Sequence, residues 1–211
     1  MLKIKVCGLR DMVNVSEVVK SAPDFAGFIF WPRSVRYVGD DPRSDLFSQV
    51  QLHVIKTGVF INEDIAKVYR IINRYCLSAV QFHGRESAEY CRGFREDGII
   101  TIKAFGIDEG FDFNLLIPYV ESCDYFLFDT KTPGFGGSGK KFDKIILRGY
   151  DFDKHFFLSG GIGYEDIDEI RNLKLRNNRF FGIDINSRFE TSPGIKNAGL
   201  IKSFIDEIRT I

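Results

Sequence analysis

A cysteine and an aspartate each stand at the end of a short apolar run in this chain. Cys7 follows Lys3-Ile4-Lys5-Val6, and Asp129 follows Tyr125-Phe126-Leu127-Phe128. A thiol and a carboxyl group are both able to carry a proton, so the two residues are a candidate base and acid pair. Each also has a structural interpretation: a buried cysteine acts as a small hydrophobe, and an aspartate often caps a turn.

Two further segments have the residue types that bind an anion. Gly160 and Gly161 follow an apolar run that ends in Ser159, and Asn186 and Ser187 follow another. Glycine lacks a Cβ atom, so its backbone N–H groups can approach a phosphate closely. The alternative is that the glycine pair forms only a tight turn. With Asn186 and Ser187 as the other side of the cradle, we expect a phosphate site here.

Apolar runs of strand length alternate with segments of helical periodicity along the chain. The predicted strands are 2–7, 25–30, 55–60, 79–82, 99–104, 125–129, 156–159 and 180–185. The predicted helices are 13–21, 63–74, 87–97, 142–147, 165–173 and 200–208, with weaker helical patterns at 43–50 and 111–120.

This alternation predicts βα units and a parallel sheet. Eight such units in 211 residues favour a single (β/α)8 TIM barrel domain over residues 1–211. The rival is a doubly wound sheet, which normally has a glycine-rich fingerprint after its first strand, and Gly8 alone does not supply one. In a barrel the carboxyl ends of the strands form one rim, where active sites lie. Cys7, Asp129 and the glycine pair are therefore expected on the same rim.

Composition excludes several classes of function. The 29 basic and 29 acidic residues balance, so no basic footprint for nucleic acid is present. No apolar run reaches the length of a membrane span, and the N-terminus lacks a secretory pattern, which predicts a cytoplasmic protein with no membrane partner. The four cysteines lack Cys-x-x-Cys spacing, so neither a metal site nor a disulfide framework is expected.

Taken in order, the motifs resemble those of the phosphoribosylanthranilate isomerase family, over residues 3–197. The matching segments are Lys5-Val6-Cys7-Gly8, Phe28-x-Phe30-x-Pro32-x-Ser34-x-Arg36, Gly58-Val59-Phe60, Val80-Gln81-Phe82-His83-Gly84, Phe128-Asp129-Thr130, Gly136-Gly137-Ser138-Gly139-Lys140, Ser159-Gly160-Gly161, Gly182-Ile183-Asp184-Ile185-Asn186-Ser187, Glu190 and Ser192-Pro193-Gly194. Each motif alone is weak, and their ordered combination is specific.

The resemblance implies an Amadori rearrangement in tryptophan biosynthesis. N-(5′-phosphoribosyl)anthranilate becomes 1-(2-carboxyphenylamino)-1-deoxyribulose 5-phosphate, with Cys7 as general base and Asp129 as general acid. The small-molecule substrate requires no cofactor or metal, because its protonated imine is the electron sink. Cys7 is then expected to gain thiolate character from nearby positive charge. Members of this fold are monomers, dimers or fused domains, so the sequence is compatible with a monomer or a homodimer and does not decide between them.

The family pattern also implies three substrate-binding residues. Arg36 is the expected partner of the anthranilate carboxylate, His83 lies in the pocket, and Asp184 assists with the sugar hydroxyls or the amine. The chain departs from the pattern at Val35, where proline is common, and at Arg188, where glycine is common. The glycine-rich segment 131–141 is a plausible loop that closes over the substrate.

Two other functions compete with this interpretation. The related phosphoribosyl isomerase of histidine biosynthesis performs the same chemistry, but with carboxylates as both acid and base, so Cys7 argues against it. A catalytically silent barrel that binds a sugar phosphate is the second, and the intact set of Cys7, Asp129 and Arg36 argues against that.

Overall fold

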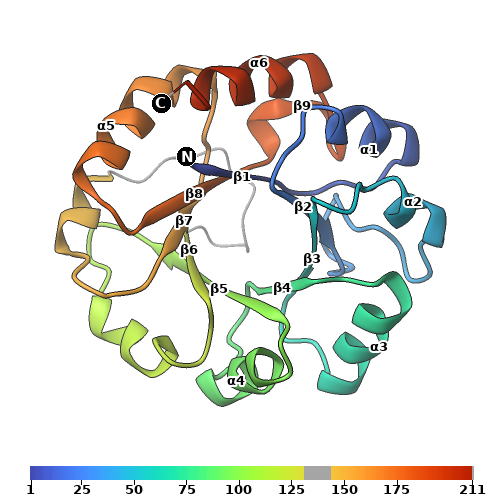
Figure 1. Cartoon of the computed structure of the whole chain (residues 1–211). Helices are drawn as coiled ribbons and strands as arrows, with labels where there is room; N and C mark the ends of the chain where they lie inside the picture. The colour runs from blue at the N-terminus through green and yellow to red at the C-terminus, as the bar shows by residue number, and fades with distance from the viewer. Residues whose placement is uncertain (131–143, 211) are drawn as a thin grey trace.

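Eight parallel strands close into a barrel in the computed structural model, which describes residues 1–130 and 144–210. Each strand pairs with the next, and β1 pairs with β8. The strands are β1 Lys3–Val6, β2 Phe25–Ile29, β3 Ile55–Phe60, β4 Ala79–Phe82, β5 Ile100–Ile107, β6 Tyr125–Thr130, β7 Phe156–Leu158 and β8 Phe180–Ile185. Helices surround this ring (Figure 1). The predicted (β/α)8 barrel is confirmed.

Polar side chains cap the N-termini of most of the surrounding helices. The helices are α1 Met12–Val19, α2 Ser44–Ser48, α3 Ile65–Tyr75, α4 Ala88–Glu96, α5 Ile167–Arg176 and α6 Ala198–Ile208. The side chains of Asp11, Asp64, Ser87 and Asn197 each accept a hydrogen bond from a backbone N–H in the first turn of the following helix. Such caps satisfy donors that the helix itself leaves free. The helix predicted from residue 63 therefore begins at Ile65, directly after its N-cap residue Asp64.

Two predicted helices differ in type. The segment predicted at 111–120 is a 3₁₀-helix, η1 Phe113–Tyr119, which contains Pro118. Proline has no N–H to donate and disfavours a regular α-helix at that point. The described part of the segment predicted at 142–147 is also a 3₁₀-helix, η2 Lys144–Gly149. Segment 131–141 lies outside the described residues.

Short elements that the sequence did not predict follow the last two barrel strands. The 3₁₀-helices are η3 Tyr164–Asp166 and η4 Ser187–Phe189, and a two-stranded hairpin is formed by β9 Glu190–Ser192 and β10 Ile195–Lys196. The hairpin matters for the site because it brings Glu190 and Lys196 to the rim. None of the helices in the described ranges is both long and apolar enough to cross a membrane.

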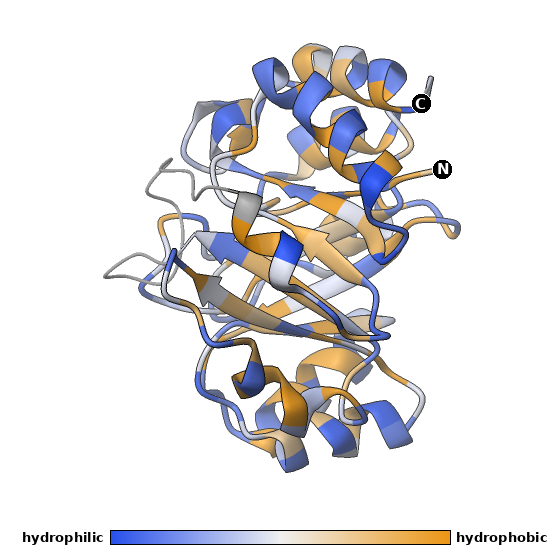
Figure 2. Ribbon diagram, turned by 90° about the vertical axis from the view of Figure 1, so that its left-hand side faces the viewer, coloured by the Kyte–Doolittle hydropathy of each residue, from blue (hydrophilic) through white to orange (hydrophobic). Residues whose placement is uncertain are grey.

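The core has two layers, one between the strands and the helices and one inside the barrel. Apolar residues dominate the strands, and hydrophilic residues lie mainly on the surrounding helices and loops (Figure 2). On β1, Ile4 and Val6 pack in the outer layer. Successive strand residues face opposite sides, so Lys5 and Cys7 point into the barrel. A fully buried lysine, at 0% exposure, therefore shares its face of the strand with the candidate base.

Candidate active site

The barrel brings most of the predicted site residues to one rim. Cys7 directly follows β1, His83 follows β4, and Asp129 and Asp184 lie near the carboxyl ends of β6 and β8. His83 Nε2 lies 3.4 Å from Asp129 Oδ2. Electrostatic coupling also links Asp184 to both Asp129 and His83. These residues therefore form one connected group, although they come from four different strands.

Cys7 is buried directly after β1, on this rim, and packs closely against β2. Its N–H donates a hydrogen bond of 2.9 Å to the Ile185 carbonyl, which continues the pairing of β1 with β8. Gly27 lies beside it: a Cβ atom at Gly27 would stand 2.9 Å from the Cys7 sulfur and 3.0 Å from its Cα atom. The absence of a side chain at Gly27 thus leaves room for the thiol.

Lys5 links Cys7 to Asp184. The register of β1 and β8 places Lys5 opposite Asp184, and the Lys5 Nζ atom lies 3.0 Å from Asp184 Oδ1. Burial favours the neutral form of Lys5, but the charge of Asp184 and the nearby Cys7 outweigh it, so the pKa of Lys5 is raised. Burial raises the pKa of Asp184, and Lys5 opposes this shift. Lys5 is therefore the group that favours the ionised form of Asp184.

The pKa of the Cys7 thiol is not lowered, in contrast to the expectation from the sequence. Burial raises its pKa above the ordinary value for a thiol, and Asp184 adds to the shift. Lys5 and Lys196 lower the pKa but do not reverse the net effect. The expected positive charge is thus present, yet burial outweighs it and favours the protonated thiol.

Asp129 is held by one backbone and one side-chain contact. Its Oδ1 atom accepts a hydrogen bond of 2.8 Å from the Thr130 N–H, and its Oδ2 atom faces His83. On the other side of the imidazole, Gln81 Nε2 lies 3.0 Å from His83 Nδ1. With the Gln81 amide nitrogen as the donor, His83 Nδ1 is the acceptor, which corresponds to the tautomer with its proton on Nε2, the atom that faces Asp129.

Arg36 belongs to a second group of charges on the rim. Its Nε and Nη2 atoms donate to the two carboxylate oxygens of Glu190, at 2.8 and 2.7 Å. Lys196, which is buried, donates to Glu190 Oε1 at 2.7 Å and to Asn186 Oδ1 at 2.6 Å. Burial lowers the pKa of Lys196, and Glu190 partly opposes the shift. One carboxylate therefore organises two cations.

Gly8 allows this second group to approach Cys7. Its φ of +78° lies in the left-handed region, which favours glycine. A Cβ atom there would stand 2.7 Å from Arg36 Cδ and 2.8 Å from Asn186 Oδ1. Asn186, predicted to bind phosphate, is thus placed beside Arg36 and Lys196.

The glycine loop after β7 has backbone angles that favour glycine, and it passes close to Thr130. Gly160 and Gly161 have φ values of +91° and +68°. A Cβ atom at Gly160 would stand 2.7 Å from the Thr130 nitrogen. Ser187 begins η4 at the end of β8. The loop therefore requires glycine, whereas the phosphate itself stays a prediction.

Arg188 is accommodated without strain. Its φ is not in the left-handed region, so the position does not require the glycine of the family pattern. The Arg188 Nη2 atom lies 2.7 Å from Glu165 Oε1, and both side chains are about half exposed. The side chain thus spans from the end of β8 to the segment after β7.

Three side chains of the site were not singled out from the sequence: Lys5, Gln81 and Lys196. Lys5 and Gln81 each stand two residues before a predicted site residue, and the alternation of a strand puts both on the same face as that residue. That signal was available. Lys196 had none, because it depends on the unpredicted hairpin. Among the described residues no group of three or more His, Cys, Asp or Glu side chains is arranged to hold a metal ion.

Comparison with known proteins identifies the family. The family model described as N-(5'phosphoribosyl)anthranilate (PRA) isomerase matches residues 4–207. A protein of that name from Parabacteroides distasonis is 44% identical over 206 residues, which cover 97% of this chain and 92% of the relative.

Solved structures of the same family are similar to this chain along its whole length. Phosphoribosyl anthranilate isomerase from Thermotoga maritima is 34% identical with a TM-score of 0.87, over 100% of both chains. A complex of such an isomerase with reduced 1-(o-carboxyphenylamino)-1-deoxyribulose 5-phosphate is 30% identical with a TM-score of 0.83, again over 100% of both chains. The chain belongs to the N-(5'-phosphoribosyl)anthranilate isomerase family.

Proposed function

We propose that this chain isomerises N-(5′-phosphoribosyl)anthranilate, with Cys7 as general base and Asp129 as general acid. The single observation that carries the proposal is the placement of a thiol and a carboxyl group at the carboxyl ends of β1 and β6, on one rim of a closed barrel. Asp184 is electrostatically coupled to both of them. The catalytic unit is the single barrel domain of residues 1–211.

Asp129 acts in the first step. Its proton passes to the furanose ring oxygen, the bond between C1′ and that oxygen breaks, and the nitrogen lone pair forms a protonated imine at C1′. The carboxylate left behind accepts a hydrogen bond from the Thr130 N–H, and His83 Nε2 lies 3.4 Å from its Oδ2 atom. Both groups therefore face the negative charge that develops on Asp129 when its proton leaves.

Cys7 acts in the second step. The thiolate removes the proton at C2′, and the electron pair moves into the protonated imine to give an enolamine. A proton then adds at C1′ as the 2′-hydroxyl loses its own, which gives the ketone. No cofactor is needed, because the protonated imine accepts the electrons.

The surrounding charges support a thiolate at this step. Three cations lie in the two groups beside Cys7: Lys5, Arg36 and Lys196. Lys5 and Lys196 lower the pKa of Cys7, which favours an anion that forms in a buried site. Burial alone disfavours the thiolate, so the cations are needed to stabilise the thiolate form of Cys7.

The substrate has handles on the same rim. Arg36 retains N–H donors beyond the two that bind Glu190, and a guanidinium group matches a carboxylate such as that of the anthranilate ring. Gly160, Gly161, Asn186 and Ser187 are the proposed phosphate ligands. Asp184 and His83 then face the sugar between these two ends.

The test is a turnover assay that follows anthranilate fluorescence during consumption of the substrate. The corresponding aminoaldose of histidine biosynthesis is assayed in parallel. We expect turnover of the first substrate and a loss of about 10²–10⁴-fold in kcat for Asp129→Asn, the usual contribution of a general acid. Full activity of that variant, or preference for the second substrate, would contradict the proposal.

A further inference from the structure

We propose that the buried ion pair of Lys103 and Glu86 is a positioning element that fixes His83 and, through it, Asp129. This inference rests on the proposed role of Asp129. Lys103 lies on β5 at 2% exposure, and Glu86 lies in the loop after β4 at 5% exposure. Their Nζ and Oε2 atoms are 3.2 Å apart. Neither residue touches Asp129 itself, so the two act through the backbone around His83.

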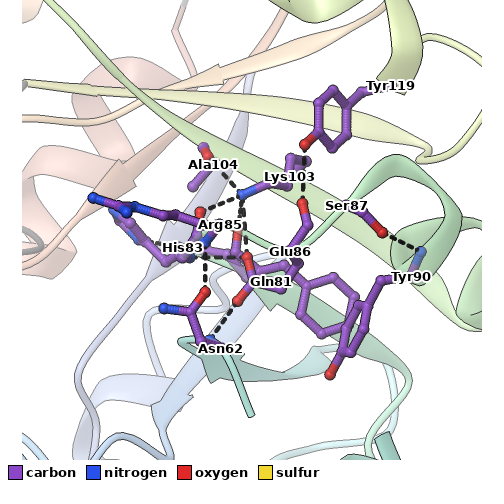
Figure 3. Close-up of polar contacts among 12 residues, drawn as sticks. Asn62, Gln81, His83, Arg85, Glu86, Ser87, Tyr90, Lys103, Ala104 and Tyr119 are labelled. Atoms are coloured by element: carbon purple, nitrogen blue, oxygen red, sulfur yellow. Dashed lines mark hydrogen bonds and ion pairs between the residues drawn. The ribbon is translucent and has the colours of Figure 1, made fainter. Parts of the chain in front are cut away.

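The pair binds the peptide groups on both sides of His83 (Figure 3). Lys103 Nζ donates to the Phe82 carbonyl at 3.2 Å and to the Gly84 carbonyl at 2.8 Å. Glu86 Oε2 accepts from the Gly84 N–H at 2.9 Å. The His83 N–H itself donates to the Phe60 carbonyl at 2.9 Å. The backbone that carries the imidazole is therefore fixed immediately before and after it.

Glu86 is itself held by the neighbouring loop and helix. Its Oε1 atom accepts from the Asn62 N–H at 2.7 Å, and its carbonyl accepts from the Tyr119 hydroxyl at 2.9 Å. Asn62 Oδ1 accepts from the Arg85 N–H at 2.6 Å (Figure 3). A Cβ atom at Gly84 would stand 2.8 Å from both Asn62 Cγ and Glu86 Oε1, so the loop leaves no room for a side chain at this position.

The contact that depends on this geometry is weak enough to be lost by a small displacement. His83 Nε2 lies 3.4 Å from Asp129 Oδ2, beyond the usual range of an N–H···O hydrogen bond. A shift of the backbone at His83 would move the imidazole away from both Gln81 and Asp129. A misplacement of about 1 Å in a catalytic group can lower the rate about 10²-fold.

Stability alone is a poor explanation for these two charges. Removing a lysine and a glutamate from water is expensive, and well-packed apolar residues often serve a fold equally well. Here both charges are directed at main-chain atoms next to one rim residue. Lys103 shares its face of β5 with Phe105, which packs against Tyr119 in the apolar layer outside the barrel. Its ammonium group reaches the loop of His83 and also donates to the Ala104 carbonyl at 3.2 Å.

The test uses Glu86→Gln, which removes the charge but keeps the shape. We expect kcat to fall about tenfold while KM changes by less than threefold, because Arg36 and the proposed phosphate ligands remain in place. Lys3→Met is the matched control: it breaks a 2.8 Å ion pair with Asp24 at the opposite end of the barrel and should leave both constants within twofold. In a His83→Gln background, Glu86→Gln should have no further effect beyond twofold, because residues that act through one another are not additive.

A second readout does not depend on turnover. The ¹⁵N spectrum of the His83 imidazole in the ligand-free protein should show the Nε2–H tautomer, and Glu86→Gln should populate both tautomers. Additive rate losses in the double variant, or an unchanged imidazole spectrum, would overturn the inference. If Glu86→Gln does not fold, Tyr119→Phe replaces it with the same criteria. Full activity of His83→Gln would instead refute the role of His83 in the proposed function, while the spectrum would still report on the ion pair.

Discussion

Replacing Lys5 by methionine removes the buried cation that joins Cys7 to Asp184. With Nζ and Oδ1 3.0 Å apart and an effective dielectric constant of about 20, Coulomb's law gives an attraction of about 5–6 kcal/mol. Part of this offsets the desolvation of the two charges. Breaking one side of such a pair typically destabilises a protein by about 3–5 kcal/mol. We expect urea unfolding, followed by the fluorescence of Trp31, to show a loss of that size at neutral pH.

The pH dependence of this loss has a defined sign. Without Lys5, burial and Asp129 raise the pKa of Asp184 in the folded state above its value in the unfolded chain, and only the smaller effect of His83 opposes them. The folded state then binds more protons than the unfolded state between these two pKa values, so stability falls as the pH rises through that window. The deficit of Lys5→Met relative to the native chain should therefore be larger at pH 7 than at pH 5. Lys5→Met/Asp184→Asn, which removes both charges, should recover most of the stability.

Catalysis should fail even where stability is recovered. The double variant lacks the cation that lowers the pKa of Cys7, and the loss of Asp184, which raises that pKa, offsets this only in part. The rise of kcat/KM with pH should therefore move to higher pH, and kcat should fall at least about 10²-fold. Stability of Lys5→Met within about 1 kcal/mol of the native chain, or activity of the double variant within threefold, would refute the reasoning.

Three other substitutions test the site from different sides. Gly27→Ala places a methyl group 2.9 Å from the Cys7 sulfur, so it should destabilise the fold by about 1–3 kcal/mol and lower kcat; thermal unfolding and turnover measure both. Arg36→Lys cannot reproduce the two-point contact with Glu190 and should raise KM at least about tenfold, whereas unchanged saturation would remove Arg36 from substrate binding. Arg188→Gly removes an exposed ion pair and should change the free energy of unfolding by no more than about 1 kcal/mol, and a larger loss would contradict its description as a surface contact.

The parts of the fold that the sequence predicted are those set by local patterns. The apolar runs that end at Cys7 and Asp129 are strands, and closure of eight parallel strands brings their ends together whatever the loops contain. The 3₁₀-helix at Phe113–Tyr119 was predicted as α-helix because apolar spacing alone does not distinguish the two. Pro118 was the available signal.

The pKa shifts in the site were harder to predict than the residues that form it. A lysine next to a cysteine indicates positive charge, but burial is a property of the folded barrel and reverses the net shift of the Cys7 pKa. Lys196 reaches the site from a hairpin with no clear strand pattern, and its partner Glu190 also binds Arg36. Such contacts join segments far apart in the chain, so neither spacing nor periodicity predicts them.

The most direct test of the account is whether Cys7 removes the proton at C2′. The measurement is the kcat of the native chain, Cys7→Ser and Cys7→Ala with substrate that carries hydrogen or deuterium at C2′, together with the affinity for a reduced product analogue. The account predicts a primary isotope effect in the native chain, a loss of at least about 10²-fold in kcat for both variants, and analogue affinity within threefold. Turnover of Cys7→Ala within threefold of the native rate, with the isotope effect intact, would contradict it.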